Sequence, residues 1–450
     1  MRIGMIAMSG TRAFSPELTK LGLTLPGFVE RGKVIASLPS LGLLTLAGLT
    51  PPDIDVEYHE IPDLDALDAP PTGFDAVAIS SFTAQIGQAY RLADQYRALG
   101  IKVILGGLHV SALPDEAAPH ADTVVIGEGE PAWPSVIDDL RRGALRPRYD
   151  AHHAARLEGF DLATAPMPRF ELLDLPRYNR LTVQTQRGCP HCCEFCASSR
   201  TIAWKYKRKP VENVIAEIRR IKKLWAHPFI ELADDNTFAD KAHGRRLAQA
   251  LAKEDIRWFT ETDVSVADDE ELLRILGDSG CAQLLIGFES PTAAGLDGLE
   301  RHANWKHHRL DRYMRAVERI QAHGITVNGC FVLGLDHTGL ESFDEVARFV
   351  RESGLYEVQI TVQTPFPGTA LYRRLGDEKR LLYPGDWARY TLFDVNFTPT
   401  DMTTAELESG FRDLAGQLYS ARATRARRHP FLRNDIRRRR GSAGHPSVEA

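Results

Sequence analysis

Short apolar runs alternate with helix-like segments along most of the chain, and this alternation constrains the fold more than any other feature. A short apolar run indicates a buried strand, whereas apolar residues spaced three and four apart indicate one face of a helix. Alternating strands and helices predict parallel sheets covered by helices, which is an α/β fold. The strand candidates are 2–8, 54–58, 74–80, 101–105, 123–126, 181–186, 229–233, 257–262, 282–288, 326–333 and 357–363.

The alternation changes scale along the 450 residues, which are more than one hydrophobic core usually serves. Residues 1–145 predict a Rossmann-like open parallel sheet, whose ligands bind beyond the carboxyl ends of the strands. Residues 146–180 have no sustained period, and we interpret them as a linker. Residues 181–370 repeat the strand–helix unit six times, which predicts a partial (β/α)6 barrel with its working face at the strand ends. Residues 371–450 predict a small helical region with a basic tail.

The overall charge gives no sign of nucleic-acid binding, because the formal net charge is −5. Arginines gather only in the C-terminal tail, which we interpret as a solvated tail, with RNA binding or contact with a membrane surface as alternatives. The N-terminus shows no charged leader before a long apolar run, and the apolar stretch 41–49 is too short to span a bilayer. We therefore expect a cytoplasmic protein. The tail arginines are Arg425, Arg427, Arg428, Arg433 and Arg437 to Arg440.

Four cysteines lie close together directly after the first strand of the second predicted domain. In a cytoplasmic chain such a group binds metal or takes part in catalysis. Cys189, Cys193 and Cys196 offer three thiolates to a [4Fe–4S] cluster, which leaves one iron open to a small molecule. The alternative is a zinc site with Cys192 or His191 as the fourth ligand, although zinc sites usually have two separated pairs. The other cysteines are expected to be buried, small apolar residues: Cys281 and Cys330.

The Cys-x3-Cys-x2-Cys spacing, with the aromatic Phe195 before the last cysteine, resembles the signature of radical S-adenosylmethionine (radical SAM) enzymes. The resemblance implies a partial TIM barrel in which SAM binds the open iron through its amino and carboxylate groups. It also implies reductive cleavage of SAM to a 5′-deoxyadenosyl radical, fed by an electron donor such as flavodoxin or ferredoxin. Phe195 is expected beside SAM.

Acidic residues follow successive strands of this region, and the family has SAM-binding elements at the corresponding places. The triplet Asp234-Asp235-Asn236 stands where the family contacts the SAM amino group, although Gly-Gly-Glu is commoner there. Glu261 ends the third strand and could reach SAM, and Glu289 ends the fourth, near the expected ribose. A single acidic residue would be a solvated loop charge, but their repetition at strand ends favours a site.

The N-terminal region resembles the cobalamin (B12)-binding domain that precedes many radical SAM domains. It lacks the Asp-x-His-x-x-Gly motif whose His ligates cobalt, as do many members of the branch that includes hopanoid methylases. Its glycines would allow close approach of a corrin or its nucleotide tail, unless they only end strands. His109 is expected either near the corrin or as an exposed loop residue. The residues implied for cobalamin are Ser80, Ser81, Thr83, Gly106, Gly107, Gly127 and Glu128.

Three functions follow from these features. The first is cobalamin-dependent radical SAM methyl transfer to an unactivated carbon of a small-molecule or lipid substrate, implied by the pairing of the two resemblances. The second is radical rearrangement, cyclisation or oxidation without methyl transfer. The third, an RNA- or membrane-binding protein, rests on the arginine tail alone. The sequence does not identify the substrate, because barrel enzymes set specificity in loops.

Overall fold

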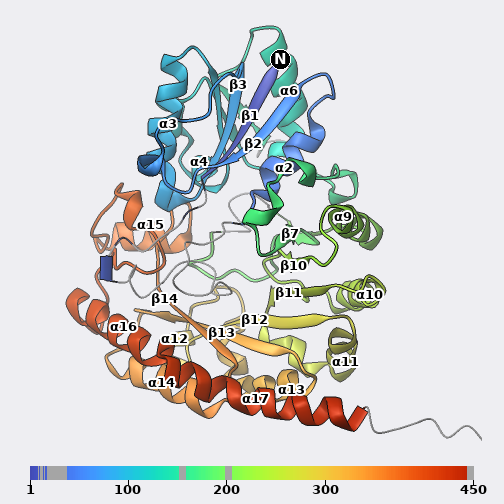
Figure 1. Ribbon diagram of the computed structural model, residues 1–450. Helices are drawn as coiled ribbons and strands as arrows, with labels where there is room; N and C mark the ends of the chain where they lie inside the picture. Colours follow the sequence, from blue (N-terminus) through green and yellow to red (C-terminus); the bar gives the residue numbers. More distant parts are fainter. Residues whose placement is uncertain are drawn as a thin grey trace, which may run out of the picture. The chain divides into compact units, whose positions relative to one another are not determined.

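The computed structural model describes two compact units of the chain. The first unit comprises residues 1–237 and 364–398, and the second comprises residues 238–363 and 399–450. The residues described are 1–8, 10, 14, 16–17, 38–151, 159–197 and 205–442. Figure 1 shows the elements with the labels used below.

A parallel six-stranded sheet forms the centre of the first unit, in the order β2-β1-β3-β4-β5-β6. Each neighbouring pair of strands is parallel. The carboxyl ends of the strands therefore meet at one edge, as the Rossmann-like prediction requires. The strands are β1 (Arg2–Met8), β2 (Asp55–Glu60), β3 (Ala76–Ser81), β4 (Lys102–Gly106), β5 (Thr123–Ile126) and β6 (Arg148–Asp150).

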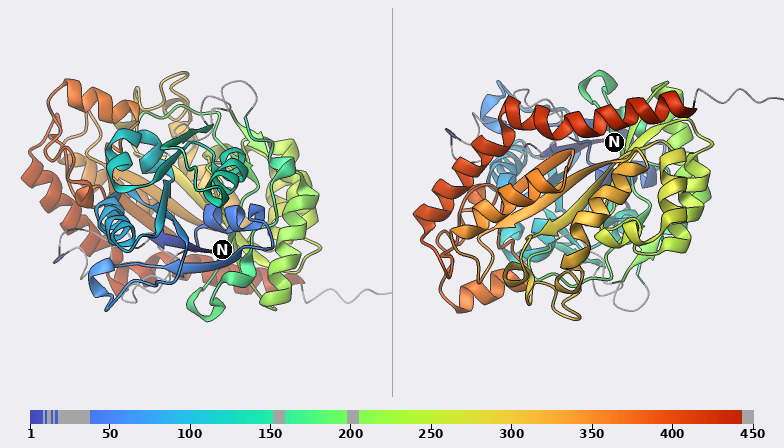
Figure 2. Two further views of the ribbon diagram at one scale, coloured as in Figure 1. Left: turned by 90° about the horizontal axis from the view of Figure 1, so that it is seen from above. Right: turned by 90° about the horizontal axis from the view of Figure 1, so that it is seen from below.

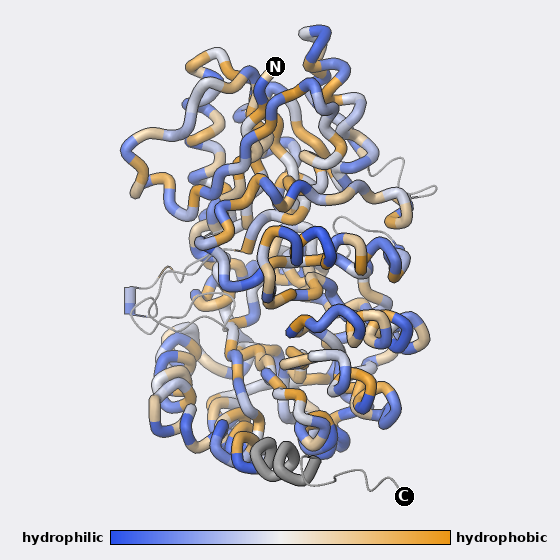
Figure 3. The backbone as a smooth tube through the Cα atoms, turned by 45° about the vertical axis from the view of Figure 1, so that its right-hand side comes forward, coloured by the Kyte–Doolittle hydropathy of each residue, from blue (hydrophilic) through white to orange (hydrophobic). Residues whose placement is uncertain are grey.

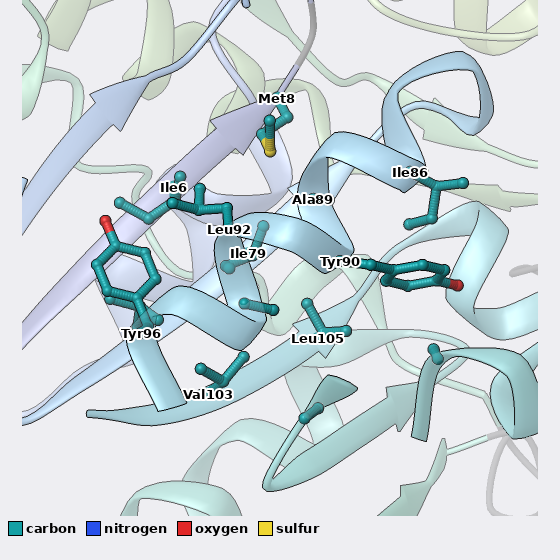
Figure 4. Packing of buried hydrophobic residues seen from close by; sticks show 14 of the residues in the cluster. Ile6, Met8, Ile79, Ile86, Ala89, Tyr90, Leu92, Tyr96, Val103 and Leu105 are labelled. Carbon is teal, nitrogen blue, oxygen red and sulfur yellow. The ribbon is translucent and has the colours of Figure 1, made fainter. Parts of the chain in front are cut away.

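Helices cover both faces of this sheet, and each face has its own hydrophobic core. Helix α3 packs over one face, where its apolar stripe meets alternate residues of the strands, as Figure 4 shows. Trp387 and Tyr390 join this core from far along the sequence. Helices α2 and α6 contribute Leu43 and Trp133 to the core of the opposite face. The helices are α2 (Leu41–Leu49), α3 (Ile86–Ala98), α4 (Leu108–Ala112), α5 (Pro114–Ala117) and α6 (Gly129–Arg141).

The first unit continues into two further pairs of strands. β7 (Leu181–Val183) and β10 (Phe229–Leu232) pair in parallel, and helix α9 (Val211–Leu224) separates them in the sequence. The two-residue strands β8 (Gln186–Arg187) and β9 (Lys207–Arg208) pair antiparallel, so they form the two legs of a long loop. Helix α15 (Ala370–Asp377) belongs to the same unit.

Four parallel strands form the second unit, in the order β14-β13-β12-β11, and helices alternate with them. In Figure 2 the helices lie on the outer side of the yellow and orange strands, and in Figure 3 helices alternate between hydrophilic and hydrophobic colours. This alternation is expected of helices buried on one side. The elements are α10 (Lys241–Leu251), β11 (Arg257–Thr262), α11 (Glu270–Asp278), β12 (Cys281–Glu289), α12 (Ala293–Leu296), α13 (Tyr313–Ala322), β13 (Thr326–Leu333), α14 (Glu341–Glu352), β14 (Glu357–Val362), α16 (Thr404–Tyr419) and α17 (Ala421–Ser442).

The α/β fold is therefore confirmed, with a parallel sheet in the N-terminal part and parallel strands alternating with helices in the later part. The interpretation of residues 146–180 as a plain linker misses β6, which adds an edge strand to the first sheet. The interpretation of the C-terminal arginines as a solvated tail is wrong for Arg427. This residue is buried, and its guanidinium contacts the Glu357 carboxylate 3.2 Å away. The predicted domain boundaries stay a prediction. Within the described residues no helix is long and apolar enough to cross a membrane.

Candidate functional site

The cysteine loop leaves the fold at β8 and returns at β9. Gly188, which precedes the first cysteine, has φ +88°, and a Cβ there would lie 3.0 Å from the carbonyl oxygen of Lys205. Only glycine fits that position without strain. The two legs therefore approach each other closely at the base of the loop. Residues 198–204, including Trp204, lie outside the described residues.

The cysteines of the loop differ in exposure. Cys189, Cys193 and Cys196 are partly exposed, whereas Cys192 is buried at 7% exposure. The three partly exposed thiols are the three that the spacing selects, and thiolates are the donors that iron–sulfur clusters take. Within the described residues no three His, Cys, Asp or Glu side chains converge on the position of a single metal ion. A cubane places each thiolate on a different iron, so its ligands need not converge in that way.

Asp234 is buried and braces the segment that leads into the cysteine loop. Its carboxylate accepts hydrogen bonds from the backbone N–H of Thr185 (2.7 Å) and Gln186 (3.0 Å) and from the Thr237 hydroxyl (2.9 Å). The Thr185 hydroxyl donates as well. Burial raises the pKa of Asp234 to about 6, against these hydrogen bonds, which lower it. Asp234 therefore holds β8 in place beneath the loop.

The neighbours of Asp234 take different positions. Asp235 is partly exposed and, with Ala233, lines a cavity of the first unit. Asn236 is 2% exposed, and its carbonyl oxygen accepts a hydrogen bond from the Gln186 side chain. Of the triplet, Asp235 is thus the residue that a ligand can reach most directly. Phe195, within the cysteine loop, is also partly exposed.

In the second unit, Glu289 lies at the end of β12 in a conformation that is unusual for a residue with a side chain. Its φ is +62°, and the register between β12 and β13 shifts beside it. The buried ammonium of Lys306 donates to the Glu289 carboxylate (2.7 Å) and to the Gly287 carbonyl oxygen (2.6 Å). Lys306 therefore fixes both the backbone and the side chain at this strand end, a role that its position in a loop did not reveal.

Cys330 and Glu261 belong to the same region of the second unit. Burial, together with the charges of Glu261 and Glu289, raises the pKa of the Cys330 thiol well above its usual value. Cys281 is buried at 5% exposure, as predicted, but Cys330 is partly exposed, so the prediction of full burial was wrong for it. Glu261 is exposed at the end of β11. The second unit thus gathers Glu261, Glu289 and Cys330 near one another.

A cavity of about 360 Å³ opens at the carboxyl edge of the first sheet. Gly107 has φ +105°, and a Cβ there would stand 3.1 Å from the Ser80 hydroxyl. Gly127 also has positive φ (+83°), and its N–H donates to the Ser111 hydroxyl. Glycines at these turns keep the mouth of the cavity open. The inner wall is apolar and includes Leu43, Ala78, Ile104, Val125 and Trp133.

The residues predicted for cobalamin divide into two groups. Ser80, Gly106, Gly107, Gly127 and Glu128 line the cavity. Ser81 and Thr83 are not among the described residues of its lining; the Ser81 hydroxyl donates to the Phe82 carbonyl oxygen, and the Thr83 hydroxyl lies 3.3 Å from His109 Nδ1.

His109 is buried at 1% exposure, so the expectation of an exposed loop residue was wrong. Its ring contacts Trp387, and Nε2 lies 3.2 Å from the Glu116 carboxylate. Burial lowers the pKa of His109, against the nearby Glu116, which raises it. His109 therefore belongs to the core beside the cavity, and its position gives it a structural role there.

Two further residues that the sequence analysis did not select also line the cavity: Gln184, between β7 and β8, and Arg187, on β8. The Arg187 guanidinium pairs with Glu128 (2.8 Å) and Glu130 (2.6 Å), and the Lys207 ammonium pairs with Glu128 (2.6 Å). Burial opposes ionisation of Glu130, but Arg187 lowers its pKa below the usual value. The sequence held a hint that Arg187 belongs to the site, because it stands directly before Gly188 and Cys189.

Comparison with known families agrees with this arrangement. Residues 183–377 match the radical SAM superfamily, and residues 36–137 match the B12-binding domain. The chain carries a radical SAM domain behind a B12-binding domain. Residues 369–447 match a domain of unknown function. The cofactors of these domains are a [4Fe–4S] cluster with SAM and cobalamin, and both fit the residues present: three thiols in one loop, and an apolar cavity with glycines at its mouth.

Curated relatives of this chain include two methyltransferases from Chlorobaculum tepidum. The bacteriochlorophyllide d C-12(1)-methyltransferase is 28% identical over 88% of this chain and 85% of its own length. The C-8(2)-methyltransferase is 27% identical over 78% of each chain. The hopanoid C-2 methylase of Rhodopseudomonas palustris is 25% identical over 78% of this chain and 66% of its own length.

A solved structure supports the fold over nearly the whole chain. The radical SAM methyltransferase TsrM from Kitasatospora setae, determined with cobalamin and a [4Fe–4S] cluster bound, superposes with a TM-score of 0.63. The superposition covers 97% of this chain and 99% of that chain at 14% identity. Identity at that level establishes a common fold and not a common substrate.

Proposed function

We propose that the protein is a cobalamin-dependent radical SAM methyltransferase that acts on an unactivated carbon of a small-molecule or lipid substrate. The observation that carries the proposal is the presence of both domains in one chain, with methyltransferase relatives aligned across most of it. When bound, the cluster with SAM supplies a 5′-deoxyadenosyl radical, and cobalamin carries the methyl group.

The protein's own residues would hold the cluster and SAM. Cys189, Cys193 and Cys196 would ligate the cluster, because their side chains are partly exposed in one loop and Cys192 is buried. Phe195, partly exposed in the same loop, would pack beside SAM. Asp235 has the exposure that a contact with the SAM ammonium needs. The remaining residues proposed for SAM are Asp234 and Asn236, as supports of that contact, and Glu261 and Glu289, as hydrogen-bond acceptors.

Cobalamin would occupy the cavity at the edge of the first sheet. The backbone at Gly106, Gly107 and Gly127 would allow close approach, and the Ser80 hydroxyl would donate or accept a hydrogen bond. Glu128 would contribute its backbone, because its carboxylate already pairs with two cations. Ser81 and Thr83 would support the turn behind this lining.

The relatives' names range over several substrate classes, so the proposal commits to the reaction and not to one compound. They include a bacteriochlorophyllide, a hopanoid and a cytidylyl phosphonate. An electron donor such as flavodoxin or ferredoxin would reduce the cluster. One relative, the anaerobic magnesium-protoporphyrin IX monomethyl ester cyclase of Rubrivivax gelatinosus, is 24% identical over 74% of this chain and favours ring formation as the second candidate function.

Isotope transfer from SAM separates these reactions. The reconstituted enzyme is given SAM with a CD3 methyl group, a chemical reductant, and either bacteriochlorophyllide d or a small-molecule and lipid extract. We expect a product that has gained a CD3 group together with formation of 5′-deoxyadenosine. Formation of 5′-deoxyadenosine and a changed substrate without CD3 would overturn methyl transfer in favour of cyclisation, rearrangement or oxidation.

A further inference from the structure

Two strands carry the cysteine loop, and each presents one cation to the same turn of the B12-binding domain. Arg187 lies on β8, where the chain enters the loop, and Lys207 lies opposite it on β9, where the chain returns. Both cations pair with Glu128, and Arg187 also pairs with Glu130. We call these four residues the charge quartet: Glu128, Glu130, Arg187 and Lys207.

The charge quartet is almost closed to solvent. The side chain of Glu128 has no exposed surface, and those of Glu130, Lys207 and Arg187 are 8%, 13% and 17% exposed. Two carboxylates meet two cations, so the charges balance. A buried, balanced network of this kind tolerates little rearrangement, because separation of any pair leaves a desolvated charge. The turn and the two legs of the loop should therefore keep one relative geometry.

The same turn forms part of the cavity proposed for cobalamin. Residues 127–130 and Arg187 all line it. Gly129 faces Leu46 on α2 closely enough that an added Cβ would stand 3.4 Å from the leucine side chain. A ligand in the cavity would thus press on the turn that holds the cysteine loop.

We infer that the charge quartet couples the two cofactor sites, so that cobalamin in the cavity stabilises the cysteine loop around its cluster. Arg187 acts as a positioning residue in this coupling: its planar guanidinium bonds Glu128 through one terminal nitrogen and Glu130 through the other, a fixed fork that the single nitrogen of a lysine does not reproduce. The inference rests on the proposed function, since it requires both cofactors. Coupling between sites is reciprocal, so the cluster should strengthen cobalamin binding by the same factor.

The test measures the rate of anaerobic iron release to a chelator, with and without hydroxocobalamin, from the full-length protein reconstituted with iron and sulfide. For the wild type we expect hydroxocobalamin to slow release about fivefold or more, the lower range of ordinary coupling. In Glu130→Gln and Arg187→Lys both cofactors should still bind, but the ratio of the two rates should fall to about one. The matched control is Arg141→Gln. Arg141 lies on the same helix as Glu130, and its exposed ion pair with Asp53 involves no residue of the quartet, so this variant should keep the wild-type ratio.

The outcomes separate this inference from the function on which it depends. A wild-type ratio near one with both cofactors bound would overturn the coupling and leave the methyltransferase proposal intact. Wild-type ratios in both charge variants would reduce the quartet to a structural role. Failure of the wild type to bind hydroxocobalamin at all would remove both proposals. If the variants lose iron entirely, the wild type still decides through the reciprocal measurement, the hydroxocobalamin affinity with and without the cluster. Coupling predicts tighter binding with the cluster, and equal affinities would overturn it.

Discussion

At the scale of single residues, two adjacent cysteines have different surroundings. Cys192 is buried and Cys193 is partly exposed, although one peptide bond separates them. We predict that Cys192→Ser keeps about four irons per chain after reconstitution, whereas Cys193→Ser loses them, since the proposal makes Cys193 a ligand and leaves Cys192 out. Iron and sulfide analysis checks this. Equal loss in both variants would show that Cys192 takes part in ligation.

Asp234 gives a prediction about pH. Its folded pKa, about 6, is higher than the ordinary value of 3.8, so the folded state binds the proton more tightly than the unfolded state. The resulting stabilisation is complete below the ordinary pKa and is lost as pH rises through the folded pKa. Asp234→Asn has no such dependence, so its stability deficit relative to wild type should shrink by about 2 kcal/mol between pH 4 and pH 7.

Urea unfolding of both proteins across that range measures the deficit. A deficit that grows with pH would contradict the raised pKa.

Residue roles were predictable only where spacing defines them. The three cysteines proposed for the cluster follow from their spacing, and they are also the three partly exposed thiols of the loop. The different positions of Asp234 and Asp235 could not be predicted from spacing, because they depend on which carboxylate accepts from the backbone N–H groups of Thr185 and Gln186. That contact joins residues about fifty positions apart, and no local pattern records it.

At the scale of elements, helix α2 forms one wall of the cavity. Gly42 is its second residue, lines the cavity, and would have no atom within 4 Å of an added Cβ. Gly42→Leu should block hydroxocobalamin binding by placing a side chain in that space. It should leave iron content unchanged and raise helix stability by about 0.5–1 kcal/mol.

Gly87 is a matched control for this substitution. It is the second residue of α3, it is equally open around an added Cβ, and it lies away from the described lining of the cavity. Gly87→Leu should gain the same helix stability and bind hydroxocobalamin as wild type does, as absorption titration would show. Normal binding by the Gly42 variant would place the cofactor elsewhere.

Strands with a clear apolar pattern were predicted well, whereas the two-residue strands were not. The runs 2–8, 123–126, 257–262 and 326–333 coincide with β1, β5, β11 and β13. β8 and β9 have two residues each, too few for an alternating pattern, so they were not predicted. They became visible only through their pairing across the cysteine loop.

At the scale of the whole molecule, the C-terminal helix α17 is part of the second unit's structure. Arg427 is buried, and it bonds the Leu418 carbonyl oxygen and the Glu357 carboxylate, which Arg428 also contacts. Arg427→Leu leaves Glu357 buried without one of its cations and should cost about 3 kcal/mol of unfolding free energy. Thermal and urea unfolding check this, with exposed Arg425→Leu as the control, which should change stability little.

This packing changes how the tail hypothesis is tested. Removal of residues 421–450 would remove Arg427 and confuse lost stability with lost binding. Removal of residues 434–450 keeps Arg427, and a tail that binds lipid or RNA should then lose retention on anionic vesicles or RNA without loss of stability. Unchanged retention would remove both roles from these residues.

Long-range packing is what the sequence could not predict at this scale. Residues 364–398 follow the last strand of the second unit but belong to the first, where Trp387 and Tyr390 enter the core beside α3. Local periodicity describes elements and not their partners, so the C-terminal region was expected as one piece. The α/β class and the order of elements were predictable, because they depend on local pattern alone.

The central claim is that one chain holds a [4Fe–4S] cluster and cobalamin at separate sites. The most direct test is anaerobic reconstitution with iron, sulfide and hydroxocobalamin, followed by metal analysis and absorption spectroscopy, of wild type and a Cys189→Ala, Cys193→Ala, Cys196→Ala variant. We expect about four irons and a corrin band in wild type, with the corrin retained and the iron lost in the variant. Iron without corrin in wild type, or zinc in place of iron, would contradict the account.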